Sequence, residues 1–122
     1  MLRIPVIIPA AFALFISAAA GAFAHAFLDH ATPAAGSTVK RAPSELKLRF
    51  TEELEPAFST VRVVDAGGKQ VDKGGGHLDA KDRTLLELPL PPLPPGIYRV
   101  VWRVVSVDTH ATRGEFKFTV AP

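Results

Sequence analysis

The sequence predicts an all-β protein, an antiparallel Greek-key β-sandwich of about seven strands. Short runs of alternating apolar and polar residues recur along residues 25–122, with glycine- and proline-containing turns between them. No run in that range indicates an amphipathic helix. Strands at this spacing in a chain of about a hundred residues are typical of a two-sheet sandwich, and a small β-barrel is the alternative.

The first clear strands lie in the middle of the chain. In residues 45–50 every second residue is apolar, as expected of a strand with one buried and one wet face. Residues 61–63 repeat that alternation, and the glycines of 66–69 predict a hairpin turn. In residues 86–88 two leucines face one way and Glu87 faces the other, so a further strand is expected there.

The strongest strand pattern lies near the C-terminus, in residues 96–107. Its apolar residues from Tyr98 to Val104 share one face, and arginines lie on the other. We therefore interpret Trp102 as the core aromatic residue of the sandwich. A last strand follows in residues 115–120, with two phenylalanines and a valine facing inward.

A proline-rich segment, residues 89–95, stands between two of these strands. Prolines at this spacing also occur in PxxP segments that recognition domains bind. We prefer the interpretation of a rigid crossover, because the segment ends in Gly96 and leads directly into the long strand.

Residues 1–24 have the composition of a secretory signal peptide. Arg3 supplies a positive charge, an apolar stretch follows to about residue 20, and residues 22–24 give an Ala-Phe-Ala cleavage pattern. Cleavage there makes His25 the first residue of an exported domain, residues 25–122. An uncleaved membrane anchor is the alternative, and two prolines in the apolar stretch argue against it.

Composition narrows the classes of ligand and partner. Without Arg3 the chain holds 13 Lys or Arg and 12 Asp or Glu, with no basic stripe, so nucleic acid and anionic membranes are poor candidates as partners. Cysteine is absent and the single methionine is Met1, so the exported domain has no sulfur ligand. Cu(I) prefers sulfur, whereas Cu(II) accepts amines, imidazoles and carboxylates.

Three residues form a candidate metal site, namely His25, Asp108 and His110. The α-amine and imidazole of an N-terminal His25 chelate one ion, and both can lose their protons to Cu(II) near neutral pH. In an extended segment, residues two apart point to the same side, so Asp108 and His110 can converge on that ion. The competing interpretations are a turn capped by Asp108 and a frayed terminus at His25.

Three motifs in the exported domain match the pattern of a known family. They are His25 followed by Thr-Pro-Ala at residues 32–34, Leu-Arg-Phe-Thr-Glu-Glu-Leu at 48–54, and Trp-Arg-Val-Val-Ser-x-Asp-x-His at 102–110. Through them the chain resembles the CopC-type periplasmic copper-binding proteins over nearly all of residues 25–120. The third motif is specific, whereas Thr-Pro-Ala alone is a weak signal.

The resemblance implies a cupredoxin-like or immunoglobulin-like sandwich that carries or buffers copper in the periplasm, for homeostasis or resistance, and is not an enzyme. It implies that His25, Asp108 and His110 are Cu(II) ligands, with Glu52 as a weak or outer ligand or a solvated turn carboxylate. It also implies a monomer and, as a partner, an inner-membrane copper transporter of the CopD type. Family members with a Cu(I) site carry methionines in the region of residues 64–79, and their absence here favours a cupric-only protein.

The chain has two further histidines. His30 is expected to lie on a strand with its ring exposed. His77 follows the glycines of residues 74–76, which predict a flexible loop, and its only expected neighbouring ligand is Asp79, a weak pair for a metal.

Two other functions stay open from the sequence. A copper-bound N-terminal histidine with a second histidine is also the redox centre of lytic polysaccharide monooxygenases, although a carboxylate ligand and a short chain argue against such an oxygenase. The other is a β-sandwich without a metal that serves adhesion or assembly.

Overall fold

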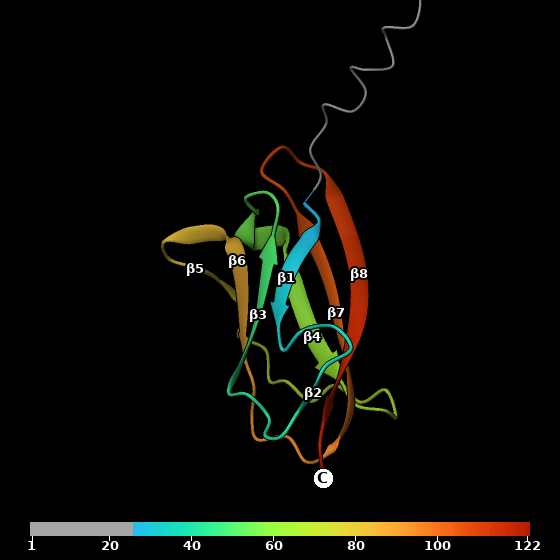
Figure 1. Cartoon of the computed structure of the whole chain (residues 1–122). Helices are drawn as coiled ribbons and strands as arrows, with labels where there is room; N and C mark the ends of the chain where they lie inside the picture. Colours follow the sequence, from blue (N-terminus) through green and yellow to red (C-terminus); the bar gives the residue numbers. More distant parts are fainter. Residues whose placement is uncertain (1–25) are drawn as a thin grey trace, which may run out of the picture.

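The computed structural model describes residues 26–122, which form eight strands and one 3₁₀ turn (Figure 1). The elements are β1 (Leu28–Thr32), β2 (Thr38–Val39), β3 (Glu45–Phe50), η2 (Pro56–Phe58), β4 (Thr60–Val64), β5 (His77–Asp79), β6 (Asp82–Pro89), β7 (Gly96–Val105) and β8 (Ala111–Val120). The predicted leader, residues 1–24, and His25 lie outside the described residues. Within residues 26–122, no helix has the length and apolar character needed to cross a membrane.

The strands form two four-stranded sheets. One sheet has the order β1-β3-β6-β5 and the other the order β2-β8-β7-β4. Neighbouring strands pair antiparallel, except that β2 runs parallel to β8. The predicted β-sandwich is therefore confirmed, with one parallel pair in addition to the expected antiparallel ones.

The core lies between the sheets and consists of the inward-facing residue of each alternating pair. The core side chains of the strands include Leu46, Leu48 and Phe50 of β3, Leu86 and Leu88 of β6, Val61 and Val63 of β4, Tyr98, Val100, Trp102 and Val104 of β7, and Phe118 and Val120 of β8. Trp102 packs edge-on against Phe50 with ring centroids 5.1 Å apart, so it is a core residue as predicted. Burying each side chain of this kind contributes about 1.5–3 kcal/mol.

The connections follow the predicted turns. The backbone N–H of Asp65 donates to the carbonyl of Lys69 at 2.8 Å and closes the glycine turn between them. Residues 90–95 join β6 to β7, and both leucines in that segment are buried. The proline-rich segment is thus a crossover packed on the core.

Three segments meet at one end of the sandwich: the residues before β1, the loop after β3, and the β7–β8 connection (Figure 1). Phe27 and Thr51 are joined by two hydrogen bonds, from Phe27 N to Thr51 Oγ1 at 3.0 Å and from Thr51 N to Phe27 O at 2.9 Å. Val107 N donates to Glu53 O at 3.0 Å. This end therefore holds together the segments that carry the predicted ligands.

Candidate metal centre

The β7–β8 connection, residues 106–110, is a tight turn. Ser106 N donates to His110 O at 3.0 Å, and Thr109 N donates to Ser106 O at 2.8 Å. Thr109 has φ +71°, in the left-handed region that few non-glycine residues adopt. The expectation of an extended segment from Asp108 to His110 is wrong, because one residue in that conformation ends the strand geometry.

The turn nevertheless brings the two predicted side chains together. Asp108 Oδ1 lies 3.3 Å from His110 Nδ1, and both side chains are partly exposed. The hydroxyl of buried Ser106 donates to the Asp108 carboxylate. That hydrogen bond, followed by those from the ring and backbone of His110, lowers the pKa of Asp108. Asp108 is therefore a carboxylate at neutral pH, the form that binds metal ions.

The chain next to His25 is fixed beside this turn. Ala26 is fully buried, and its carbonyl accepts a hydrogen bond from Thr112 Oγ1 at 2.7 Å. Thr112 lies on β8, two residues after His110. His25 is outside the described residues, so its part in the site stays a prediction.

Glu52 lies in the loop that borders the same turn. It is half-buried, and the next two residues contact the end of β7: Glu53 accepts from Val107, and Leu54 pairs with Ser106. Its role as a weak or outer ligand stays a prediction.

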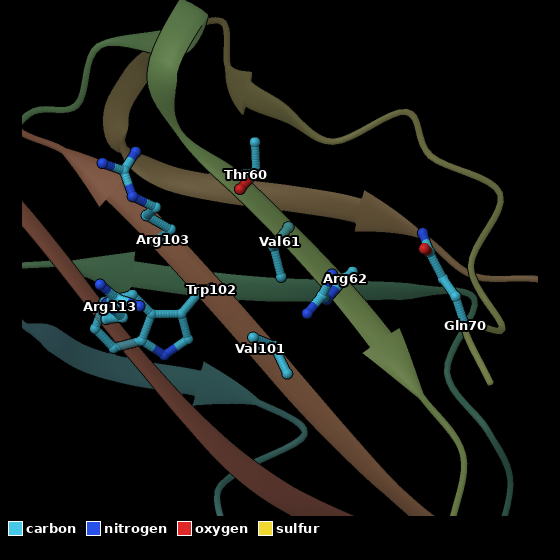
Figure 2. Close-up of a pocket in the computed structure, with 8 residues that line it drawn as sticks. All are labelled: Thr60, Val61, Arg62, Gln70, Val101, Trp102, Arg103 and Arg113. Atoms are coloured by element: carbon cyan, nitrogen blue, oxygen red, sulfur yellow. The ribbon is translucent and has the colours of Figure 1, made fainter. Parts of the chain in front are cut away.

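A surface pocket of about 450 Å³ lies over β4, β7 and β8 (Figure 2). It is lined by Thr60, Val61, Arg62, Gln70, Val101, Trp102, Arg103 and Arg113. Its charged lining side chains are all arginines, and none of the lining residues has an imidazole or a carboxylate. Three positive side chains disfavour a metal cation there, and the pocket shares no residue with the candidate centre.

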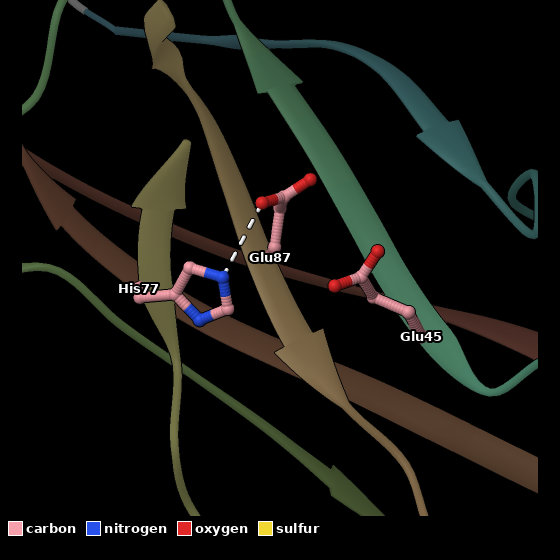
Figure 3. A group of neighbouring side chains, drawn as sticks. All are labelled: Glu45, His77 and Glu87. Atoms are coloured by element: carbon pink, nitrogen blue, oxygen red, sulfur yellow. Dashed lines mark ion pairs between the residues drawn. The ribbon is translucent and has the colours of Figure 1, made fainter. Parts of the chain in front are cut away.

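The other histidines lie on the opposite sheet. His30 is exposed on β1, as predicted. His77 begins β5 and pairs across the sheet with Glu87 on β6. Its Nε2 lies 3.3 Å from Glu87 Oε1, and Glu45 on β3 completes a cluster whose ligand atoms all lie within 4.8 Å of one another (Figure 3).

Two expectations about His77 are thereby overturned. It lies on a strand, and it has carboxylates of two other strands beside it. The neighbour expected from the sequence, Asp79, instead accepts a hydrogen bond from Lys81 N at 2.9 Å and caps the β5–β6 turn. Short local runs do not show cross-strand pairing, and only the register of β5 on β6 identifies Glu87 as the partner.

Comparison with known proteins places the chain in a family. Residues 28–121 match the CopC domain. The chain belongs to the CopC family. The family predicted from the three motifs is therefore confirmed.

Solved CopC-family structures and a named relative agree with this assignment. CopC from Methylosinus trichosporium OB3b is 40% identical with a TM-score of 0.76, over 80% of this chain and 95% of that one. PcoC from Escherichia coli, a methionine-rich copper resistance protein, is 33% identical with a TM-score of 0.70, over 80% and 99%. Copper resistance protein C of Escherichia coli is 35% identical over 88% of this chain and 90% of that protein. Unlike the methionine-rich PcoC, this CopC-family chain has one methionine, Met1.

Proposed function

We propose that this CopC-family protein binds one Cu(II) ion in the periplasm and acts there as a copper carrier or buffer, in homeostasis or resistance, without catalysis. The names of its relatives support the copper role, since PcoC and copper resistance protein C are copper resistance proteins. The lack of sulfur beyond Met1 supports the cupric state, because Cu(I) prefers thiolate and thioether ligands.

The proposed ligands are the α-amine and imidazole of His25, the carboxylate of Asp108 and the imidazole of His110. The observation that carries this proposal is the hydrogen bond from Thr112 Oγ1 to the carbonyl of Ala26. Ala26 is the residue after His25, and Thr112 on β8 is two residues after His110, so the bond holds the two segments side by side. One residue spans at most about 3.6 Å, so a terminus anchored at Ala26 stays within reach of the turn.

The spacing of Asp108 and His110 also supports shared ligation. Their nearest oxygen and nitrogen are 3.3 Å apart. Two adjacent ligands of one tetragonal ion lie about 3 Å apart when each metal bond is about 2 Å long. A small rotation of either side chain is therefore enough to place both atoms on one Cu(II) ion. Glu52 is proposed as an outer carboxylate of this site.

The proposal includes processing and a partner. Removal of residues 1–24 exposes the α-amine of His25 and exports the domain, 25–122, as a monomer. A CopD-type transporter of the inner membrane is the proposed recipient or source of the copper.

The first experiment tests the terminus. The intact mass of the protein recovered from the periplasm, with and without Cu(II), reports cleavage and stoichiometry together. Cu(II) titrations then compare protein that begins at His25 with protein that carries one extra glycine before it. The extra residue converts the amine to an amide, so affinity should fall without being abolished. Equal affinities near neutral pH contradict the proposed ligation.

The second experiment tests the turn. His110→Ala should remove most of the Cu(II) affinity, and Asp108→Ala should remove less, because it leaves the nitrogen ligands in place. His30→Ala is the matched control, since it deletes an exposed imidazole on β1. If His110→Ala and His30→Ala bind Cu(II) equally well, the site lies elsewhere.

A further inference from the structure

One face of the β1-β3-β6-β5 sheet gathers charged side chains that the proposed copper site does not use. Glu87 lies between buried Leu86 and Leu88, so its side chain is on the outer face of β6. Its cross-strand partners are His77 on β5 and Lys47 on β3. Glu45 is two residues before Lys47 and therefore on the same face.

The ring of His77 has a defined tautomer. Its Nδ1 lies 3.0 Å from the carbonyl of Gly75. A carbonyl oxygen only accepts hydrogen bonds, so Nδ1 carries a proton and donates it. The other nitrogen, Nε2, faces Glu87 Oε1 at 3.3 Å (Figure 3). In metal-binding histidines, a hydrogen bond from the nitrogen that does not bind the metal, often to a backbone carbonyl, fixes the orientation of the ring. The bond from His77 Nδ1 to the Gly75 carbonyl is of this kind.

When Nδ1 carries the only ring proton, the lone pair of His77 Nε2 faces the negative oxygen Glu87 Oε1. These two atoms repel each other unless a cation lies between them. Either a proton on Nε2 or a metal ion can fill that place. A metal ion that displaces this proton satisfies Nε2 and the carboxylates together.

The Glu87 carboxylate is poorly compensated without such an ion. Glu87 is only 8% exposed. Its contacts with His77 Nε2 at 3.3 Å and with Lys47 Nζ at 3.7 Å are both longer than ordinary charge-assisted hydrogen bonds. Lys47 is also 3.7 Å from Glu45 and is half-exposed, so it can leave when another cation enters.

We propose that Glu45, His77 and Glu87 form a second metal site, which takes a divalent transition-metal ion, Zn²⁺ or Cu²⁺, through one imidazole nitrogen and two carboxylate oxygens. Their ligand atoms all lie within 4.8 Å of one another, and the ligands of one such ion lie at most about 4 Å apart. The side chains of His77 and Glu45 are partly exposed, so their rotation can bring the ligand atoms to the closer spacing that one ion requires. The imidazole selects against Ca²⁺ and Mg²⁺, and the absence of sulfur selects against Cu(I).

This site shares no residue with His25, Asp108 and His110, so the two proposals fail separately. Backbone amide NMR spectra of the purified protein locate each ion. Zn²⁺ should shift the amides around Gly75, His77 and Glu87, and paramagnetic Cu²⁺ should broaden them once the first equivalent is bound elsewhere. If neither ion perturbs these amides up to several equivalents, the second site does not exist.

Substitutions separate the two sites. His77→Ala should lower Zn²⁺ affinity at this site by at least about tenfold, the loss seen even for residues that only orient a ligand. His110→Ala should leave it unchanged, and His30→Ala on the same sheet is the control for removal of an exposed imidazole. Circular dichroism confirms that each variant is folded. Perturbation of residues 75–87 that persists in His77→Ala overturns the proposal.

Lys47 supplies an independent test. Lys47→Gln removes the competing ammonium group and leaves a neutral polar side chain that is one atom shorter. Affinity for Zn²⁺ at this site should rise by up to about fivefold, the value of one exposed ion pair. A salt-bridge cluster without metal affinity predicts no Zn²⁺ binding in either the parent protein or this variant, and that result overturns the proposal.

Discussion

Gly114→Ala should destabilise the sandwich by about 1–3 kcal/mol, the usual effect of forcing an extra carbon into a packed core. Gly114 pairs across strands with Trp102. A β-carbon at Gly114 would lie 2.4 Å from Cζ2 and 2.9 Å from Cε2 of the indole, whereas ordinary contact begins near 3.4 Å. The ring would have to move by about 1 Å, and Phe50 packs edge-on against it.

Urea denaturation measures this effect. Circular dichroism is the suitable signal, because Trp102 is the only tryptophan and its fluorescence would report the altered contact itself. The matched control is Gly67→Ala, whose new carbon would meet only Asp65 Oδ1 at 3.5 Å and should change the unfolding free energy by about 0.5 kcal/mol or less. Equal midpoints for Gly114→Ala and the parent refute the argument.

A double-mutant cycle tests the cause. Trp102→Phe shortens the ring system that the new methyl group would meet, and Trp102 Nε1 has no acceptor within the described residues, so no partner loses a hydrogen bond. The double variant should therefore be less destabilised than the sum of the two single variants. Additive free energies would show that the methyl group and the indole do not collide.

Three further predictions concern single residues. Thr109→Asn should raise the unfolding free energy by about 1 kcal/mol, because asparagine tolerates the φ of +71° better, and a decrease in denaturant midpoint contradicts this. Ser106→Ala removes the hydrogen bond that contributes most to the lowered pKa of Asp108, so carboxyl NMR titration should show that pKa rising toward 3.8, and an unchanged value refutes the assignment. The Thr84 and Arg49 contacts lower the pKa of Asp82, so its contribution to stability is complete above the unfolded pKa of 3.8 and is lost as pH falls through the folded value. The stability difference between the parent and Asp82→Asn should therefore be constant near neutral pH and disappear in acid, and a pH-independent difference contradicts it.

The long strands could be predicted from the sequence because their alternation is a local signal. In the runs that became β3, β7 and β8, every second residue is less exposed than its neighbours, as the two-residue period of a strand requires. β5 could not be predicted in this way. It has three residues after a glycine run, and its pairing with β6 depends on tertiary contacts that no local pattern contains.

The candidate site shows the same limit. The sequence predicted that the side chains of Asp108 and His110 lie close together, and they do. The predicted extended geometry was wrong, because a turn with Thr109 in the left-handed region brings them together. Glu87 was expected to face away from the two leucines, and it does face outward. It is nevertheless buried, because His77 and Lys47 on the flanking strands cover it. The alternating pattern of β6 alone does not show that His77 and Lys47 lie over Glu87.

The two proposed metal sites should respond differently to processing of the chain. In the uncleaved protein the nitrogen of His25 is an amide, so the proposed chelate at the β7–β8 turn lacks one ligand. Glu45, His77 and Glu87 lie on β3, β5 and β6, far from the N-terminus in the sequence, so this site does not depend on processing of the terminus. Full-length protein should therefore bind Cu(II) more weakly at His110 than the cleaved protein does, while Zn²⁺ still shifts the amide of His77 equally in both. Equal Cu(II) affinity at His110 before and after cleavage would show that removal of the leader does not create the cupric site.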